Sequence, residues 1–188
     1  MRHIFLSFFV FLWSVSASAT DPKVYFSPSF DCEKAIIKRI NNAQQTVDVA
    51  VYSINNPRLI GALISAHQSG KKVRILTDGN QAEKSYSRVH ELEKADIPVI
   101  RTVKRNTMHD KFVVLDGEKA VSGSFNWTQA ATFKNTENCI LFDNNPETVS
   151  SYQNRFEELW KLFSEASENK KTSQSAKDNQ KNGMEPIF

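Results

Sequence analysis

Residues 108–128 read MHDKFVVLDGEKAVSGSFNWT, and this stretch decides how the sheet of the protein is built. Two short runs, KFVVL and KAVSG, flank the pair Asp116-Gly117, which is typical of a tight hairpin turn. The stretch therefore predicts two neighbouring antiparallel strands. It also carries His109 and Lys111 at the head of the first strand, and an apolar core would favour neither side chain there.

The chain before this hairpin alternates between strand and helix patterns. Period-two alternation and β-branched residues indicate strands, whereas apolar residues spaced three and four apart indicate helices. Strands are predicted at residues 23–27, 46–54, 71–78 and 97–101, and helices at residues 31–43, 56–70 and 81–95. Asp31 can cap the first helix, and Pro57 fits the first turn of the second. This βαβ rhythm implies parallel strand pairs with helices packed on the sheet.

The chain after the hairpin adds one more strand and one more helix. Residues 137–143 (ENCILFD) predict a strand, so the predicted fold class is α/β, with a mixed β-sheet flanked by helices. The last helix begins near Asn145-Pro146, and its apolar stripe predicts that it covers the sheet. The stripe consists of Val149, Tyr152, Phe156, Leu159, Trp160 and Phe163.

The two ends of the chain differ in composition from this central domain, which spans residues 20–163. Residues 1–19 join a short basic head to an apolar run and a small-residue cleavage site near Ala19, a pattern typical of a secretory signal peptide. An uncleaved membrane anchor is the alternative. We therefore expect an exported protein, periplasmic or secreted. Residues 164–188 are polar, which predicts a disordered tail.

The net charge is mild and constrains the partner only weakly. The whole chain carries +3, and cleavage of the signal peptide removes Arg2 and leaves +2. This charge permits an anionic partner without requiring one. Basic residues are nevertheless concentrated around His109, and an ordinary solvated loop is the alternative to a binding role. They are Arg101, Lys104, Arg105 and Lys111.

The two cysteines, Cys32 and Cys139, leave two interpretations open. Export permits a disulfide between them. Cys139, however, lies inside a predicted buried strand, and a free cysteine is a common core residue. The sequence alone does not provide the geometry that would decide between these possibilities.

Two pairs of polar residues in the opening stretch suit a phosphoryl group. His109 and Lys111 are two residues apart, so they project from the same face of a strand. Ser124 and Asn126 repeat this spacing, and Gly123 permits close approach of the backbone. A histidine supplies nucleophilic or acid–base chemistry, while a cation and neutral donors stabilise charge on phosphoryl oxygens.

Other polar residues have weaker claims to a chemical role. We expect Asp116 to fix the hairpin turn rather than to contact a phosphate. Glu137 could orient His109 from the start of the last strand, and a solvated acid is the alternative. No His, Cys, Asp or Glu group has the spacing of metal ligands, with His67 and His90 placed in helices, so we expect no metal and no other cofactor.

The pattern His109-x-Lys111-x4-Asp116, followed by Gly123-Ser124-x-Asn126, resembles the HKD motif of the phospholipase D superfamily. Residues 135–138 (NTEN) are similar to the Glu-Asn block of that family, and residues 50–54 and 63–78 are similar to its N-terminal half. The resemblance covers residues 24–163. It is strongest to small bacterial members, which are secreted endonucleases with a single motif.

The resemblance implies a metal-independent phosphodiesterase with a phosphohistidine intermediate on His109. It implies that Lys111, Asn126 and Ser124 hold the phosphate oxygens and that Glu137 orients His109. Asp116 completes the motif, although we assign it a structural role. The family mechanism uses two histidines, whereas this chain carries one motif and no repeat. We therefore expect a homodimer with the active site on its two-fold axis.

Three functions remain open at this point. A non-specific endonuclease on DNA, or also on RNA, is favoured because the flanks of His109 are basic and polar. Arg101, Lys104 and Arg105 would contact neighbouring phosphates. A phospholipase D would need an apolar or amphipathic surface near the site, where residues 101–108 supply only Met108 as a large apolar side chain. The complete polar set argues against a non-catalytic nucleic-acid-binding protein.

Overall fold

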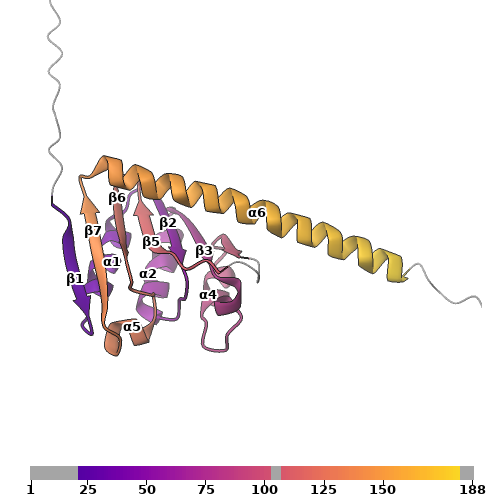
Figure 1. Cartoon of the computed structure of the whole chain (residues 1–188), viewed down its shortest axis with the longest axis horizontal. Helices are drawn as coiled ribbons and strands as arrows, with labels where there is room; N and C mark the ends of the chain where they lie inside the picture. Colours follow the sequence, from indigo (N-terminus) through magenta and orange to yellow (C-terminus); the bar gives the residue numbers. More distant parts are fainter. Residues whose placement is uncertain (1–20, 103–106, 183–188) are drawn as a thin grey trace, which may run out of the picture.

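A single mixed sheet of seven strands organises the protein, whose computed structural model describes residues 21–102 and 107–182. Figure 1 shows helices α1 and α2 behind the sheet and the long helix α6 crossing it. These helices span Asp31–Asn42, Pro57–Gln68 and Pro146–Asn182. The strand order is β1-β7-β6-β5-β2-β3-β4. The predicted α/β fold class is confirmed, while the predicted signal peptide lies outside the described residues.

Parallel pairing joins the three strands at one side of the sheet, as the βαβ rhythm predicts. They are β2 (Thr46–Val51), β3 (Lys72–Thr77) and β4 (Val99–Arg101). The connection from β2 to β3 runs through α2, whose first residue is Pro57. The Asn56 side chain caps this helix by accepting from the backbone amides of Arg58 and Leu59. Local capping and proline geometry therefore fix where α2 begins.

Antiparallel pairing joins the other four strands. They are β5 (Lys111–Leu115), β6 (Lys119–Gly123), β7 (Glu137–Asp143) and β1 (Lys23–Ser27). The predicted hairpin is confirmed, since Asp116 and Gly117 both have positive φ and the Glu118 amide donates to the Leu115 carbonyl at 3.0 Å. In this register Lys111, Gly123 and Glu137 stand at strand ends on the same side of the sheet. We name this side, where the strand ends meet, the active edge.

The two faces of the sheet support two separate cores. Val113 and Leu115 point toward α1 and α2, whereas Phe112 and Val114 point toward α6. From α6, the predicted stripe buries Val149, Phe156, Leu159 and Phe163 in the second core, with Tyr152 and Trp160 partly buried against it. Full burial of each large apolar side chain contributes about 1.5–3 kcal/mol, so α6 is held on the sheet chiefly by this stripe.

The polar region before β4 differs from its prediction as one helix over residues 81–95. It forms two short helices, α3 (Gly79–Ala82) and α4 (Val89–Lys94). The intervening residues carry no apolar stripe that a continuous helix could bury, and only Val89 and Leu92 of α4 are buried. Asp31 is likewise not the cap of α1, because Phe30 holds that position and Asp31 lies in the first turn.

Two further helical segments were not predicted as helices. Residues Gln129–Phe133 form the short helix α5, which is capped by Thr128. Helix α6 continues to Asn182, where a disordered tail was predicted from residue 164. Residues 164–182 contain neither proline nor glycine, the two residues least favourable to a helix, so their sequence permits a helical backbone. Within the described residues, no helix is both long and apolar enough to cross a bilayer.

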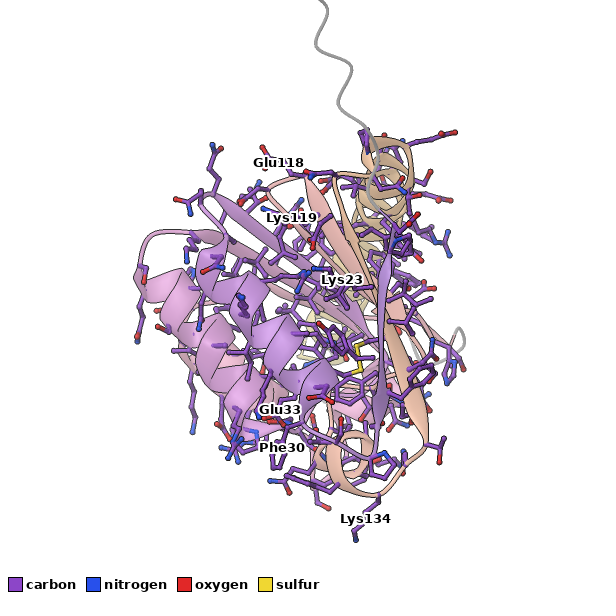
Figure 2. The ribbon with its side chains drawn as sticks, turned by 90° about the vertical axis from the view of Figure 1, so that its left-hand side faces the viewer. Lys23, Phe30, Glu33, Glu118, Lys119 and Lys134 are labelled. Carbon is purple, nitrogen blue, oxygen red and sulfur yellow. A yellow bond between two sulfur atoms is a disulfide. The ribbon has the colours of Figure 1, made fainter. Side chains whose placement is uncertain are left out.

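A disulfide joins Cys32 of α1 to Cys139 of β7, and it is visible in yellow in Figure 2. The two Cα atoms lie 5.9 Å apart, within the range that disulfide geometry requires. Both cysteines are fully buried in the core between α1 and the sheet. Of the two interpretations of the cysteines, the disulfide is therefore the one that the structure adopts.

Candidate active site

The active edge holds His109 and Lys111 side by side, as their spacing predicts. Lys111 opens β5 and pairs with Val51 at the end of β2. Its Nζ lies 3.2 Å from His109 Nδ1 and donates to the His109 carbonyl oxygen at 2.7 Å. Because His109 is exposed, a potential nucleophile and a cation face solvent together.

Tyr52 completes this cluster, and the sequence analysis did not single it out. Its ring centroid lies 4.5 Å from that of His109, and Lys111 Nζ lies 5.2 Å from the centre of the Tyr52 ring. Gln81 Nε2 donates to the Tyr52 hydroxyl at 2.9 Å. Tyr52 therefore restrains the His109 ring and offers the Lys111 ammonium a cation–π contact.

The pKa of Lys111 is lowered from 10.5. Burial of its ammonium is the largest cause, and the attraction of the Glu137 and Asp110 carboxylates only partly opposes it. A bound phosphate would add negative charge beside this ammonium and favour its protonated form. Lys111 is therefore placed where an anionic ligand would stabilise it.

The Gly123-Ser124 segment is clamped to β7 by close backbone contacts. A Cβ atom on Gly123 would lie 2.3 Å from the Asn138 carbonyl oxygen, and its φ of +148° is one that other residues rarely adopt. The Ser124 amide donates to that same oxygen at 3.1 Å, and the Asn138 amide donates to Ser124 Oγ at 3.0 Å. Glycine is thus required for Ser124 to reach its place at the active edge.

Asn126 has a buried side-chain oxygen that lacks a hydrogen-bond partner among the described residues. Its neighbour Trp127 bonds through its backbone to Ser53 and Asn55, just beyond the end of β2. The Tyr52 amide in turn donates to the Asp110 carbonyl, so Asn126 and His109 flank the same short segment. An unpaired buried acceptor is costly, so the Asn126 amide is a candidate for a ligand contact, and its Nδ2 group is the part that can donate to a phosphoryl oxygen.

Glu137 lies at the active edge as the first residue of β7, but its contact differs from the predicted one. Its Oε1 accepts from Asn135 Nδ2 at 3.0 Å, and the hydrogen bonds of the described residues include none between Glu137 and His109. Its charge acts instead on Lys111. Orientation of His109 by Glu137 therefore stays a prediction for the assembled or ligand-bound site.

Asp116 lies at the opposite edge of the sheet from His109, at the hairpin turn. Its carboxylate accepts hydrogen bonds from the backbone amides of Gln44, Gln45 and Thr46 at 2.7–2.9 Å. These three contacts tie the β5–β6 turn to the loop that enters β2. The geometry gives Asp116 the structural position that its Asp-Gly context suggests.

A cavity of about 510 Å³ opens beside His109, between the active edge and α6. Its lining is polar and apolar in about equal parts, with Ser122, Thr148 and Ser151 among its polar residues and Phe112 and Tyr152 on its apolar side. Helix α6 contributes the cation Arg155 to this lining. Its Nη2 lies 3.9 Å from an Asp110 carboxylate oxygen. Sequence reasoning missed Arg155 because only the docking of α6 brings it to the active edge.

Arg101, Lys104 and Arg105 were predicted to contact neighbouring phosphates, and of these three only Arg101 lies within the described residues. Arg101 lies on the edge strand β4 and forms a salt bridge with Glu93, with contacts of 2.9 and 2.6 Å. Lys104 and Arg105 lie outside the described residues. Across residues 21–102 and 107–182, no three His, Cys, Asp or Glu side chains form a group that could hold a metal ion.

Curated proteins of two kinds are similar to this chain. A mitochondrial cardiolipin hydrolase from Chlamydomonas reinhardtii is 33% identical over 124 residues, which cover 66% of this chain and 55% of that protein. A phospholipase D from Rickettsia prowazekii is 32% identical over 139 residues, which cover 74% of this chain and 68% of that protein. The chain thus spans about half of the first relative and two thirds of the second.

Solved structures and a family comparison agree with these relatives. The crystal structure of the phospholipase D family member Nuc from Salmonella typhimurium has a TM-score of 0.71 and 26% identity. The match covers 75% of this chain and 94% of Nuc. Residues 36–160 match the family described as "Cardiolipin synthase, PLD-like domain", and this range includes all six residues of the HKD and Gly-Ser-x-Asn patterns. The chain therefore belongs to the phospholipase D superfamily.

Proposed function

We propose that the protein is a phosphodiesterase that acts through a phosphohistidine intermediate on His109. The contact between the His109 ring and the Lys111 ammonium, at an exposed edge beside a cavity, is the observation that carries this proposal. Lys111 and neutral donors such as Asn126 can stabilise charge on the phosphoryl oxygens without a metal ion.

The reaction proceeds in two displacement steps. Attack by a His109 ring nitrogen forms an N–P bond and breaks the P–O bond to the leaving alcohol, which takes a proton from a general acid. Water then attacks phosphorus, breaks the N–P bond and leaves a phosphomonoester. A second histidine is the natural general acid. Because the motif occurs once, we propose that it comes from a second copy of the chain, which makes the enzyme a homodimer.

Nucleic acid is the substrate that we favour. The cavity beside His109 presents hydroxyl groups and Arg155, which suit a phosphodiester backbone better than an acyl chain. The match to Nuc over 94% of its length supports the same choice, since that name suggests action on nucleic acid. Among the residues that the structure describes we identify no base-reading element, and we propose cleavage without sequence preference.

A phospholipid is the second candidate, and one specific observation favours it. Three exposed aromatic residues, Phe26, Phe30 and Phe133, lie near the active edge, where Ser27 pairs with Glu137. Phe26 is 65% exposed and Phe133 is 51% exposed. Exposed aromatic side chains suit a membrane interface, and the curated relatives named above are called cardiolipin hydrolase and phospholipase D.

One assay separates the two substrates and tests the chemistry. The purified protein is incubated in EDTA with plasmid DNA, and in parallel with vesicles of phosphatidylcholine and cardiolipin. We expect plasmid cleavage in EDTA and no headgroup release. His109→Ala, with unchanged circular dichroism, should lower the rate at least about a thousandfold because the nucleophile is lost. Headgroup release without DNA cleavage would reverse the ranking, and loss of all activity in EDTA would contradict the metal-independent mechanism.

A further inference from the structure

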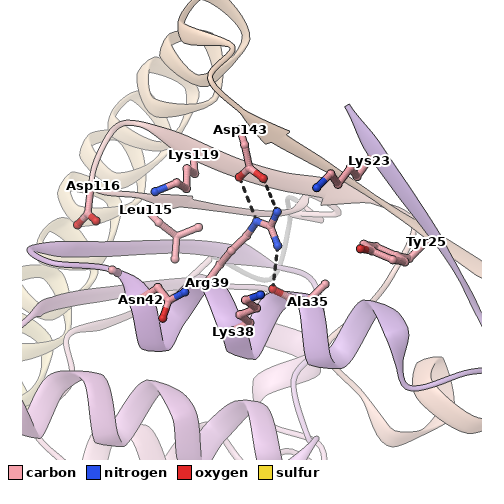
Figure 3. Close-up of a pocket in the computed structure, with 11 residues that line it drawn as sticks. Lys23, Tyr25, Ala35, Lys38, Arg39, Asn42, Leu115, Asp116, Lys119 and Asp143 are labelled. Carbon is pink, nitrogen blue, oxygen red and sulfur yellow. Dashed lines mark hydrogen bonds and ion pairs between the residues drawn. The ribbon is translucent and has the colours of Figure 1, made fainter. Parts of the chain in front are cut away.

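A second cavity lies at the opposite edge of the sheet from His109. Its volume is about 290 Å³, and it lies between β1, α1 and the β5–β6 turn. Figure 3 shows Lys23 and Lys119 on its sheet side, Lys38 on its helix side, and Arg39 between them. We name it the lysine pocket. Because Asp116 lines it while His109 does not, it is separate from the active edge.

The two carboxylates of the lysine pocket are already engaged. Asp143 accepts from Arg39 Nε at 3.2 Å and from Arg39 Nη2 at 2.5 Å. Arg39 also donates to the Ala35 carbonyl at 3.3 Å, so its guanidinium is fixed against α1. Asp116 accepts the three backbone amides described above. Neither carboxylate is therefore placed to neutralise the lysines of the pocket fully.

The three lysines of the pocket are only partly compensated within the described residues, where the charge of Lys119 acts on the Asp116 carboxylate. Within the described part of the chain, Lys23, Lys38 and Lys119 form no salt bridge. Four cations and two carboxylates line the pocket, which gives it a net charge of +2, against +3 for the whole chain. The lining of this cavity, which lies away from the active edge, is therefore positively charged.

The other walls of the pocket suit an organic group attached to an anion. The Tyr25 ring and the Leu115 side chain provide apolar surface, and Asn42 provides an amide. A volume of about 290 Å³ is at the small end of the range for ligand pockets. The ligand that fits is small, carries close to two negative charges and has a short organic part.

We propose that the lysine pocket is a binding site for phosphomonoesters. A phosphomonoester carries about −1.5 to −2 at pH 7 and offers three acceptor oxygens, which matches the pocket's charge and its three ammonium donors. A phosphodiester carries one charge and two free oxygens and is the poorer fit. The proposal does not require the proposed function, although hydrolysis of a phosphodiester would supply a ligand of this class.

Amide chemical shifts of the ¹⁵N-labelled protein test the proposal. Inorganic phosphate, thymidine 5′-monophosphate, glycerol 3-phosphate and dimethyl phosphate are titrated in turn. The amides of Gln44, Gln45 and Thr46 report on the lysine pocket through Asp116, whereas those of Ser124 and Asn138 report on the active edge. We expect saturable shifts of the first set with the monoesters, and binding of dimethyl phosphate at least about tenfold weaker.

Two charge-matched triple variants make the test specific. Lys23→Gln, Lys38→Gln and Lys119→Gln together should weaken monoester binding about tenfold or more, because three charge-assisted contacts are lost. The control is Lys84→Gln, Lys94→Gln and Lys161→Gln, which changes three exposed lysines outside the pocket and should leave the affinity unchanged. Single Lys119→Gln gives a smaller change in the same direction should the triple variant unfold.

The outcomes separate the proposal from its rivals and from the proposed function. Tighter binding of thymidine 5′-monophosphate than of glycerol 3-phosphate supports a site for nucleic-acid ends, and the reverse order supports a site for lipid phosphates. Absent shifts at the pocket amides, or equal losses in both triple variants, overturn the proposal. A protein without phosphodiesterase activity whose pocket amides still shift retains the binding site and loses only the proposed function.

Discussion

Lys111 interacts with an imidazole, an aromatic ring and a distant carboxylate at the same time. Its Nζ is close to His109 Nδ1 and faces the Tyr52 ring, while Glu137 acts on it through charge. None of these neighbours forms a salt bridge with it among the described residues. The ammonium is therefore held in position without being neutralised, which is the arrangement that an anion-binding lysine needs.

Asp116→Ala is expected to lower the free energy of unfolding by about 1–3 kcal/mol, because three backbone amides lose their acceptor. The cleavage rate of the folded variant should be that of the wild type, since Asp116 lies at the edge opposite His109. Urea denaturation and the plasmid assay measure these two quantities. Asp116→Asn is the matched control, because it keeps one acceptor oxygen. A large loss of activity with unchanged stability would contradict the structural role.

The pH dependence of stability provides a further readout of the same substitution. Burial opposes ionisation of Asp116, but the amides of Thr46, Gln44 and Gln45 and the charge of Lys119 outweigh it, and its pKa falls below 3.8. A lowered folded-state pKa stabilises the protein fully above the unfolded value, and this contribution disappears as the pH falls through the folded value. The difference between wild type and Asp116→Ala should therefore be constant near neutrality and shrink below about pH 4.

The sequence predicted some of the residues that lie around His109 and missed others. The contact between His109 and Lys111 agrees with their two-residue spacing and is local in the chain, although His109 itself precedes β5. Tyr52 and Arg155 reach the same edge from a different strand and from α6, and Arg101 is bound by Glu93 instead. Those positions depend on how the elements pack, which residue spacing does not encode.

The junction between β6 and β7 is the element that sets the position of Ser124 and Asn126. The two strands approach so closely at Gly123 that the Asn138 carbonyl occupies the space of a Cβ atom. The disulfide fixes β7 to α1 at the next residue, Cys139. The junction is therefore restrained from both sides and cannot shift to accept a side chain at position 123.

Gly123→Ala is expected to lower the free energy of unfolding by about 2 kcal/mol or more, from the steric conflict and the positive φ. Cleavage activity should also fall, because the strands must separate and move Ser124. Gly61→Ala in α2 is the control, since its Cβ would meet no atom within 4 Å, and it should stabilise the protein by about 0.5–1 kcal/mol. Equal stability for both variants would contradict the close contact at the junction.

Elements with a strong apolar period were predicted well, and those without one were not. An apolar face is buried on the strands, on helices α1 and α2, and on the first turns of α6. Their apolar residues therefore recur at a regular spacing in the sequence, and this spacing predicts the element. Helices α3, α4 and α5 are four to six residues long, and the Asp78 and Thr128 side chains cap only α3 and α5. The extension of α6 was not predicted as a helix because its polar sequence has no apolar period.

The disulfide links Cys32 to Cys139, two residues that are 107 positions apart in the sequence. Replacing Cys32 and Cys139 together by Ala should lower the free energy of unfolding by about 3–5 kcal/mol, since the bond restricts a long loop in the unfolded chain. Thermal denaturation with and without a reducing agent tests this. The agent should lower the Tm of the wild type and leave that of the double variant unchanged. Equal sensitivity of both proteins would contradict the disulfide.

The proposed homodimer can be tested with a mixed dimer of wild-type and variant subunits. If two copies share one active site, each supplies His109 to the same phosphate. A purified heterodimer of wild type with His109→Ala should then be strongly impaired, because one of the two histidines is missing from the shared site. Differently tagged subunits and a two-step purification provide that species. A rate near half of the wild-type value would show that each subunit works independently.

The hairpin geometry gives the spacing of the sequence motif a physical meaning. Lys111 opens β5 and Asp116 follows its last residue, so the interval between them equals one full crossing of the sheet, about 17 Å at the usual rise per residue. Lys111 lies at the active edge and Asp116 at the opposite edge. The number of residues between them is therefore set by the length of β5. Deletion of one residue within β5 would turn Lys111 to the other face of the sheet if Asp116 kept its place. The interval between Lys111 and Asp116 therefore corresponds to the length of a strand, and we propose a chemical role only for the first half of the motif.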